Sequence, residues 1–94
     1  MTPAANLTAR ELAVLAEAFR LANLLVAQML DDMPAATLDG ARWRDTRTAL
    51  DPREHAGEVI DMVACAVSWG EDTGLIARHP QHRYLVRLTR EVLA

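Results

Sequence analysis

Three carboxylates in this sequence are spaced so that they would share one face of a helix. Glu54, Glu58 and Asp61 stand four and three positions apart, and residues at these spacings lie one above another on an α-helix. Oxygen ligands grouped in this way suit hard cations such as Mg²⁺. The same pattern is typical of a solvated helix face, or of a face that forms ion pairs with a basic stripe. We therefore keep the three acids as candidate metal ligands, while expecting that the chain as a whole needs no metal or cofactor.

Two of these acids lie in a segment that resembles part of a known enzyme family. Glu58-Val59-Ile60-Asp61, followed by the apolar run 62–67, is similar to the ExxD helix of the all-α nucleotide pyrophosphohydrolases, the MazG-like fold. In that family, ExxD and an EExxE motif on an earlier helix hold Mg²⁺ against a nucleoside triphosphate. The resemblance thus implies a Mg²⁺-dependent nucleotide hydrolase with Glu58 and Asp61 as ligands. It covers about one helix, and of the EExxE motif the nearest segment, 10–14, keeps one acid, Glu11. This activity is therefore an alternative reading.

The histidines and the cysteine have simpler explanations than chemistry. His79 and His82 have the spacing of a metal-ligand pair, but no further histidine or cysteine lies near them in the sequence, as a transition-metal site would require. Cys65 would have Asp61 one helical turn away, and a neighbouring carboxylate disfavours the thiolate that a cysteine nucleophile needs. The sequence also contains no nucleophile elbow, phosphate-binding glycine loop or HExxH motif. These features favour a protein that is not an enzyme.

A tryptophan surrounded by arginines is the most distinctive candidate for binding. Trp43 is flanked by Arg42, Arg44 and Arg47, and tryptophan and arginine are enriched at the energetic centres of protein interfaces. The sequence therefore predicts that these four residues contact a protein partner. The alternative is that Trp43 fills the core beside Trp69.

The first helix has clear signals at both of its ends. Thr8 is a suitable N-cap, with Glu11 three positions later as the partner of a capping box. The run 12–30 is apolar apart from four positions. The helix should end near Asp31-Asp32, because Pro34 disfavours helical geometry at the residue before it.

The remainder of the chain is predicted to be helical as well. The composition is 51% hydrophobic and only 4% aromatic, which favours helices over a sheet. We expect a short helix over 38–49, a third helix from Asp51 to Trp69 or slightly beyond, and a last helix beginning at Pro80. The sequence thus predicts an all-α fold, a small bundle of three to four helices in a single domain over residues 1–94. The last helix would carry a basic stripe able to pair with the three acids, formed by Arg83, Arg87 and Arg90.

The apolar arc of the first helix is wider than a small bundle needs. An exposed apolar patch of that kind usually marks an interface, so residues 12–30 are predicted to form a homodimer. The run is close to the length of a membrane span, but Glu17 and Arg20 at its centre would each cost about 2.5–3.5 kcal/mol on insertion. We therefore expect no contact with a membrane.

Charge and cysteine content limit the remaining classes of function. The net charge is −3, which is unfavourable for a general nucleic-acid binder, although the arginines near the C-terminus leave a nucleic-acid-binding module as a second alternative. A single cysteine and the lack of a basic leader segment at the N-terminus fit the cytoplasm.

Together these observations predict a non-enzymatic, protein-binding regulator, adaptor or inhibitor of bacterial or phage origin. It would act through its helix surfaces and form a homodimer through residues 12–30.

Overall fold

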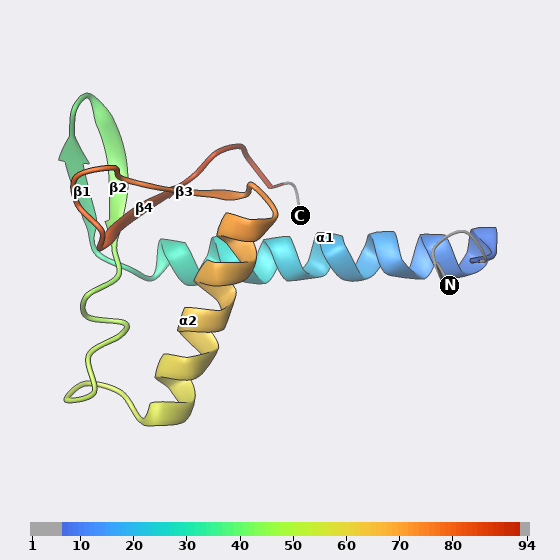
Figure 1. Ribbon diagram of the computed structural model, residues 1–94, viewed down its shortest axis with the longest axis horizontal. Helices are drawn as coiled ribbons and strands as arrows, with labels where there is room; N and C mark the ends of the chain where they lie inside the picture. The colour runs from blue at the N-terminus through green and yellow to red at the C-terminus, as the bar shows by residue number, and fades with distance from the viewer. Residues whose placement is uncertain (1–6, 93–94) are drawn as a thin grey trace.

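The chain combines helices with strands. In the computed structural model, which describes residues 7–92, the elements in order are α1 (Ala9–Asp31), β1 (Ala35–Leu38), β2 (Ala41–Asp45), α2 (Gly57–Asp72), β3 (Ile76–Arg78) and β4 (Leu85–Leu88) (Figure 1). The prediction of an all-α bundle of three to four helices is therefore wrong. The fold is α+β, with two helices and a four-stranded antiparallel sheet.

Helix α1 begins and ends where the sequence predicted. The Thr8 hydroxyl accepts a hydrogen bond from the backbone N–H of Glu11 at 3.1 Å, and the Glu11 carboxylate accepts one from the backbone N–H of Thr8 at 3.2 Å. This capping box satisfies two of the N–H groups that a helix leaves unpaired at its start. The last helical residue is Asp31, three residues before Pro34.

The predicted short helix over 38–49 is instead the hairpin of β1 and β2. Asp39 and Gly40 have φ values of 54° and 75°, the conformation of a two-residue hairpin turn in which both central residues have positive φ. Asp-Gly is among the sequences that favour this turn most strongly. The strands pair from Leu38 with Ala41 to Ala35 with Arg44, so the turn residues override the weak helix propensity on either side of them.

The predicted helix beginning at Pro80 is also absent, because this part of the chain forms β4. Residues 85–88 pair with β2 on one side and with β3 on the other, giving the strand order β1-β2-β4-β3. Leu85 and Val86 are both buried. A short apolar run of this kind fits a buried strand as well as a helix. The arginines of this segment do not form a helical stripe, and no ion pair with the three acids occurs within residues 7–92.

Helix α2 begins later than predicted, at Gly57. Asp51, the predicted N-cap, instead accepts a hydrogen bond on its side chain from the backbone N–H of Arg53 at 2.9 Å. Such a local turn competes with helix formation. The helix ends at Asp72, and Gly74 follows with a φ of 77°, in agreement with the predicted end.

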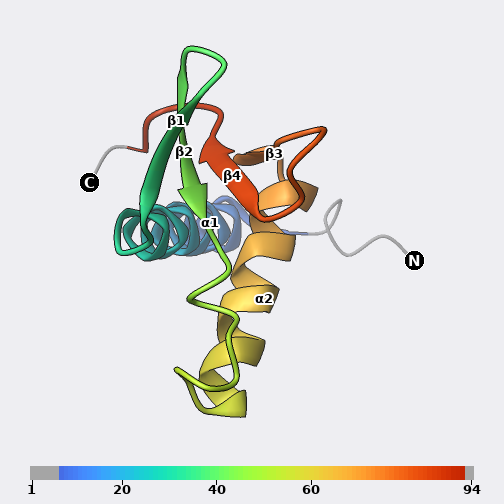
Figure 2. The same cartoon turned by 90° about the vertical axis from the view of Figure 1, so that its left-hand side faces the viewer.

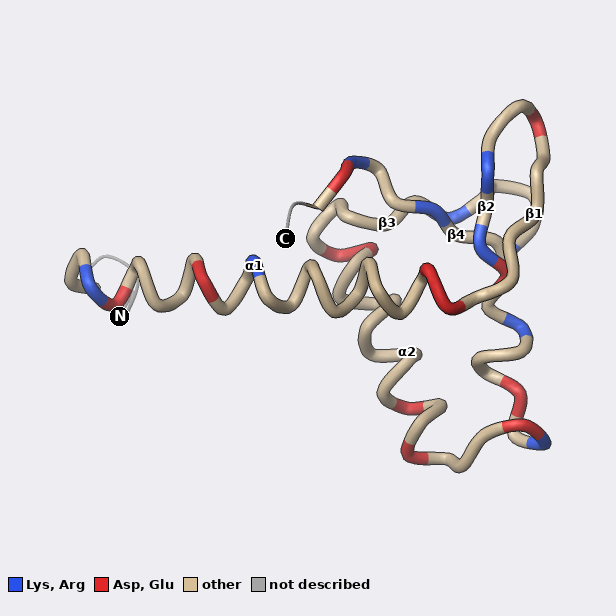
Figure 3. Tube along the Cα trace, turned by 180° about the vertical axis from the view of Figure 1, so that it is seen from behind, with Lys and Arg blue, Asp and Glu red and all other residues tan. Residues whose placement is uncertain are grey.

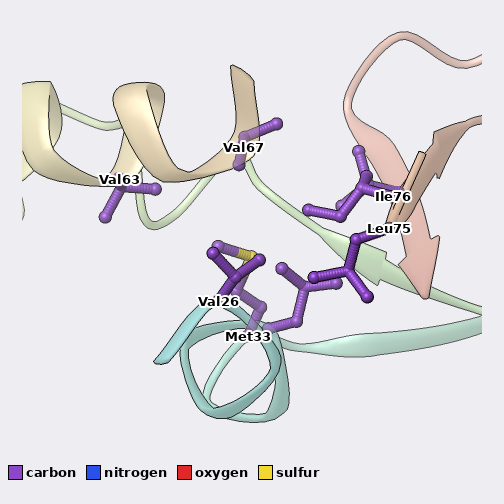
Figure 4. Packing of buried hydrophobic residues seen from close by; sticks show 8 residues of the cluster. Val26, Met33, Val63, Val67, Leu75 and Ile76 are labelled. Atoms are coloured by element: carbon purple, nitrogen blue, oxygen red, sulfur yellow. The ribbon is translucent and has the colours of Figure 1, made fainter. Parts of the chain in front are cut away.

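The core lies between the two helices and one face of the sheet (Figure 4). The C-terminal half of α1 contributes Val26 and Leu30, α2 contributes Val63 and Val67, and the sheet side contributes the rest. The N-terminal half of α1 extends beyond this core as a single helix (Figure 1). The members of this core from outside the helices are Met33, Leu75, Ile76 and Val86.

Candidate functional site

The most unusual surface of the molecule is the exposed apolar side of α1. Eight large hydrophobic side chains are exposed among the described residues, and six of them lie on this helix. Leu25 is 66% exposed, as much as many polar surface residues. An isolated helix gains little stability from its own hydrogen bonds in water. The projecting part of α1 would therefore be stabilised mainly by packing of its apolar face against another surface. The six are Leu12, Val14, Leu15, Phe19, Leu21 and Leu25.

An apolar groove of about 470 Å³ continues this surface onto α2. Its α2 wall includes Met62, which is 65% exposed, and Cys65, which is a free and exposed thiol. The sequence placed Cys65 one helical turn from Asp61, and this wall was missed. The apolar Met62, next to Asp61 in the sequence, was the available signal. The lining residues are Ala22, Leu25, Val26, Met29, Met62, Val63, Cys65, Ala66 and Trp69.

Contacts around Trp69 hold the two helices at a fixed distance across the groove. The ring of Phe19 lies 5.0 Å from the ring of Trp69, centroid to centroid. The Trp69 indole N–H donates a hydrogen bond to the Asn23 side-chain oxygen at 3.3 Å. Because an aromatic contact and a hydrogen bond both fix this corner, the groove exists before any partner arrives.

Charged groups on α1 lie away from the groove. Glu17 and Arg20 form an ion pair of 2.6 Å with each other, and the hydrogen bond from Arg20 holds the pKa of the Glu17 carboxyl below its ordinary value. The helix carries no charged residue from 21 to 30, which Figure 3 shows as a tan stretch without red or blue. By length and composition α1 would also be able to span a membrane, a criterion that core helices of soluble proteins meet as well.

The four residues predicted to bind a partner do not form one cluster. Successive side chains of a strand point to opposite faces, and Trp43 is separated in this way from Arg42 and Arg44. Trp43 is only 7% exposed and donates its indole N–H to the Leu38 carbonyl at 3.2 Å. Trp43 is therefore buried, but it lies outside the core cluster against which Trp69 packs, so it does not fill the core beside Trp69. A binding role for the four remains a prediction.

The three arginines have different environments. Arg44 donates hydrogen bonds to the Met33 carbonyl at 3.0 Å and to the Asp31 carboxylate at 3.3 Å. Arg47 pairs with Asp45 at 2.6 Å and lies 3.9 Å above the Tyr84 ring. Arg42 is exposed, and no ion pair with it occurs in the described part of the chain.

A buried histidine that the sequence did not explain joins two loops. His79 is buried, and its Nε2 lies 2.9 Å from the Asp39 carboxylate in the hairpin turn. Its Nδ1 accepts hydrogen bonds from the backbone N–H groups of Gln81 and His82. Both ring nitrogens therefore have protein partners, so His79 positions the β3–β4 loop against the hairpin. A metal-ligand pair with His82, which the spacing alone would allow, is not formed by this geometry.

The candidate metal ligands do not share one helix. Glu54 precedes α2, whereas Glu58 and Asp61 lie on it. No group of three or more histidine, cysteine or acidic side chains arranged to hold a metal occurs among residues 7–92. The fold implied by the ExxD resemblance, an all-α bundle, also differs from the one observed.

Comparison of this chain with protein families, curated proteins and solved structures finds no match.

Proposed function

We propose that this protein is a non-enzymatic regulator, adaptor or inhibitor that acts by binding protein through the apolar surface of α1, and that it forms a homodimer through residues 12–30. The observation that carries the proposal is the concentration of exposed apolar side chains on one helix, with six of eight on α1. Contiguous apolar patches of this kind mark interaction sites in soluble proteins.

The geometry of the surface supports binding of a helix better than binding of a small molecule. The groove is an open corner between α1 and α2, and the exposed apolar face of α1 continues from it. A small-molecule site is usually an enclosed cavity with a few converging polar groups. An amphipathic helix docks instead into an open apolar groove through residues at helical spacing.

The proposed interface is tested by sedimentation equilibrium at micromolar concentration. The wild-type chain should sediment with twice its monomer mass of 10.4 kDa. Leu25→Glu should weaken self-association on the order of a hundredfold or more, because it places a charge in an apolar contact. Ala13→Glu is the matched control, since it puts the same charge on the other side of the helix. It should leave the dimer intact.

Two results would contradict the proposal. A wild-type chain that remains a monomer throughout the concentration range has no interface on α1 of the proposed kind. Flotation of the monomer with lipid vesicles, together with loss of flotation in Leu25→Glu, would assign the apolar face to a membrane instead.

A further inference from the structure

Four residues on the exposed side of α1 form a pattern that reads the same in both directions. Leu15, Ala18, Ala22 and Leu25 are separated by three, four and three positions, so on an α-helix they form one narrow seam. The order along the seam is large, small, small, large. Leu15 and Leu25 are both exposed. Such a seam can pack against a second copy of itself that runs in the opposite direction. The small residues at its centre allow the two helices to approach closely, and the large residues pack above and below this centre.

We infer that the partner of this seam is a second copy of the chain in antiparallel orientation, and that the projecting half of each α1 occupies the α1–α2 groove of the other copy. This inference rests on the proposed function. A two-fold axis between positions 18 and 22 sets Ala18 opposite Ala22 of the second copy, and Leu15 opposite Leu25 of the second copy. A two-fold contact of this kind uses the same patch on both subunits.

The position of the groove selects the antiparallel arrangement. Ala22, Leu25 and Met29 line the groove, so the C-terminal half of the seam is also its α1 wall. An antiparallel partner places its own projecting N-terminal half beside these residues, against Met62 and Cys65. In a parallel dimer, the projecting halves of the two α1 helices would pack against each other, and both grooves would stay open.

The charges on α1 are compatible with this packing. No charged residue lines the groove, and Glu17 and Arg20 neutralise each other on the other side of the helix. Glu11 lies one step beyond Leu15 on the same line, opposite Met29 of the second copy, and its carboxylate accepts a hydrogen bond from the backbone N–H of Thr8. The seam from Leu15 to Leu25 itself therefore buries no charge, which would be costly.

The exposed apolar area near the seam and the groove is enough for a small interface. A half-exposed side chain of this size presents on the order of 100 Å². Five exposed hydrophobic residues therefore offer about 500 Å² per copy, or about 1,000 Å² in total, the smallest area expected of a biological interface. Four lie on α1 and one on α2, and they are Leu12, Leu15, Phe19, Leu25 and Met62.

The native cysteine allows a direct test of this arrangement. Cys65 is the only cysteine in the chain, and Leu12 lies two turns before Phe19, on the side of α1 that faces α2. A chain with Leu12→Cys and Cys65→Ser, mixed with the wild type, carries one thiol per copy. A crosslink between positions 12 and 65, formed with a short bis-maleimide and mapped by mass spectrometry, must therefore join two copies.

The expected yield of this crosslink is at least about tenfold above that of a matched control. The control carries Ala13→Cys and Cys65→Ser, whose thiol is rotated about 100° around α1 from position 12 and points away from the seam. If the mixture sediments as a dimer but the two yields are equal, the antiparallel arrangement is overturned while the proposed function stands. If the mixture is monomeric, both are overturned.

A bulky residue at the centre of the seam gives a second readout that needs no crosslinker. Ala18→Trp should raise the dimer dissociation constant at least about tenfold, whereas Ala13→Trp should leave it unchanged. Circular dichroism of both variants verifies that α1 is still formed. Equal dissociation constants for the two would contradict close approach of the helices at Ala18.

Discussion

Trp43 and His79 form a small buried unit on the face of the sheet that points away from the helices. Their rings meet edge to face with centroids 4.8 Å apart, and the guanidinium of Arg87 lies 5.3 Å from the Trp43 ring centroid on the same face. The Trp43 indole N–H bonds to the end of β1 and His79 bonds to the Asp39 turn. This unit therefore stabilises the hairpin from the side that the main core does not reach.

Loss of the Trp43 side chain should cost stability. We expect Trp43→Ala to lower the free energy of unfolding by about 3–5 kcal/mol, the usual range for a buried aromatic residue, measured by urea denaturation. Fluorescence of a Trp69→Phe variant isolates Trp43, whose emission should be blue-shifted in the monomer. Unchanged stability together with lost partner binding would instead assign Trp43 to an interface.

An ion pair between α2 and β3 should make stability depend on acid pH. Glu71 and Arg78 lie 2.6 Å apart, and the hydrogen bond from Arg78 lowers the pKa of Glu71 from its ordinary value of 4.5. A carboxyl whose pKa is lower in the folded state stabilises the fold above its unfolded pKa, and this stabilisation is lost as the pH falls through the folded pKa.

Glu71→Gln should therefore reduce the stability at neutral pH by no more than about 1 kcal/mol, because the pair is partly exposed. The difference between variant and wild type should shrink as the pH falls below about 4.5. Urea midpoints at pH 7 and pH 3 provide the measurement. If the variant and the wild type differ in stability by the same amount at pH 7 and pH 3, the ion pair is not the source of that difference.

At the scale of elements, Gly70 is where α2 meets β3 most closely. A Cβ added at this position would lie 2.4 Å from the Ile76 Cδ1 atom. We expect Gly70→Ala to destabilise the fold by about 1–3 kcal/mol through overpacking, despite the higher helix propensity of alanine. Gly57→Ala is the control, because nothing lies within 4 Å of the added atom. Thermal unfolding of both variants measures the difference. Equal stability of Gly70→Ala and Gly57→Ala would contradict close packing of α2 against β3 at Gly70.

The sequence predicted the long elements well and the short ones poorly. The Thr8 capping box and the apolar run of α1 are local signals, and both of its ends were predicted correctly. The strands were missed because each has only three to five residues, too few for a period of two to be distinguished from a helical period. Asp39-Gly40 was the one strong sequence signal for a hairpin.

The candidate site was predictable in part. The wide apolar arc of the first helix pointed to residues 12–30, because periodicity shows which side chains share a face. Periodicity could not show the groove, because the walls of the groove come from two helices far apart in the sequence. Periodicity also could not show that Trp43 is buried, because this burial depends on the His79 loop folding back against the hairpin.

At the scale of the whole molecule, the apolar surface is distributed unevenly. The C-terminal half of α1 belongs to the core, while the N-terminal half lies outside it as one long projection (Figures 1 and 2). The hairpin stands on the other side of the molecule from this projection. A partner on α1 and a partner on the outer face of the sheet therefore need not compete for the same surface.

The strand order also constrains how the chain acquires its structure during synthesis. Of the four strands in residues 7–92, β4 leaves the ribosome last, yet it lies between β2 and β3. Until residue 88 has emerged, the hairpin presents an open edge and β3 has no neighbour in the sheet. An open edge is a template for pairing with other chains. Nascent chains that stall before Leu85 should therefore be sensitive to protease and prone to aggregate, and the completed chain should lose both properties in a single step.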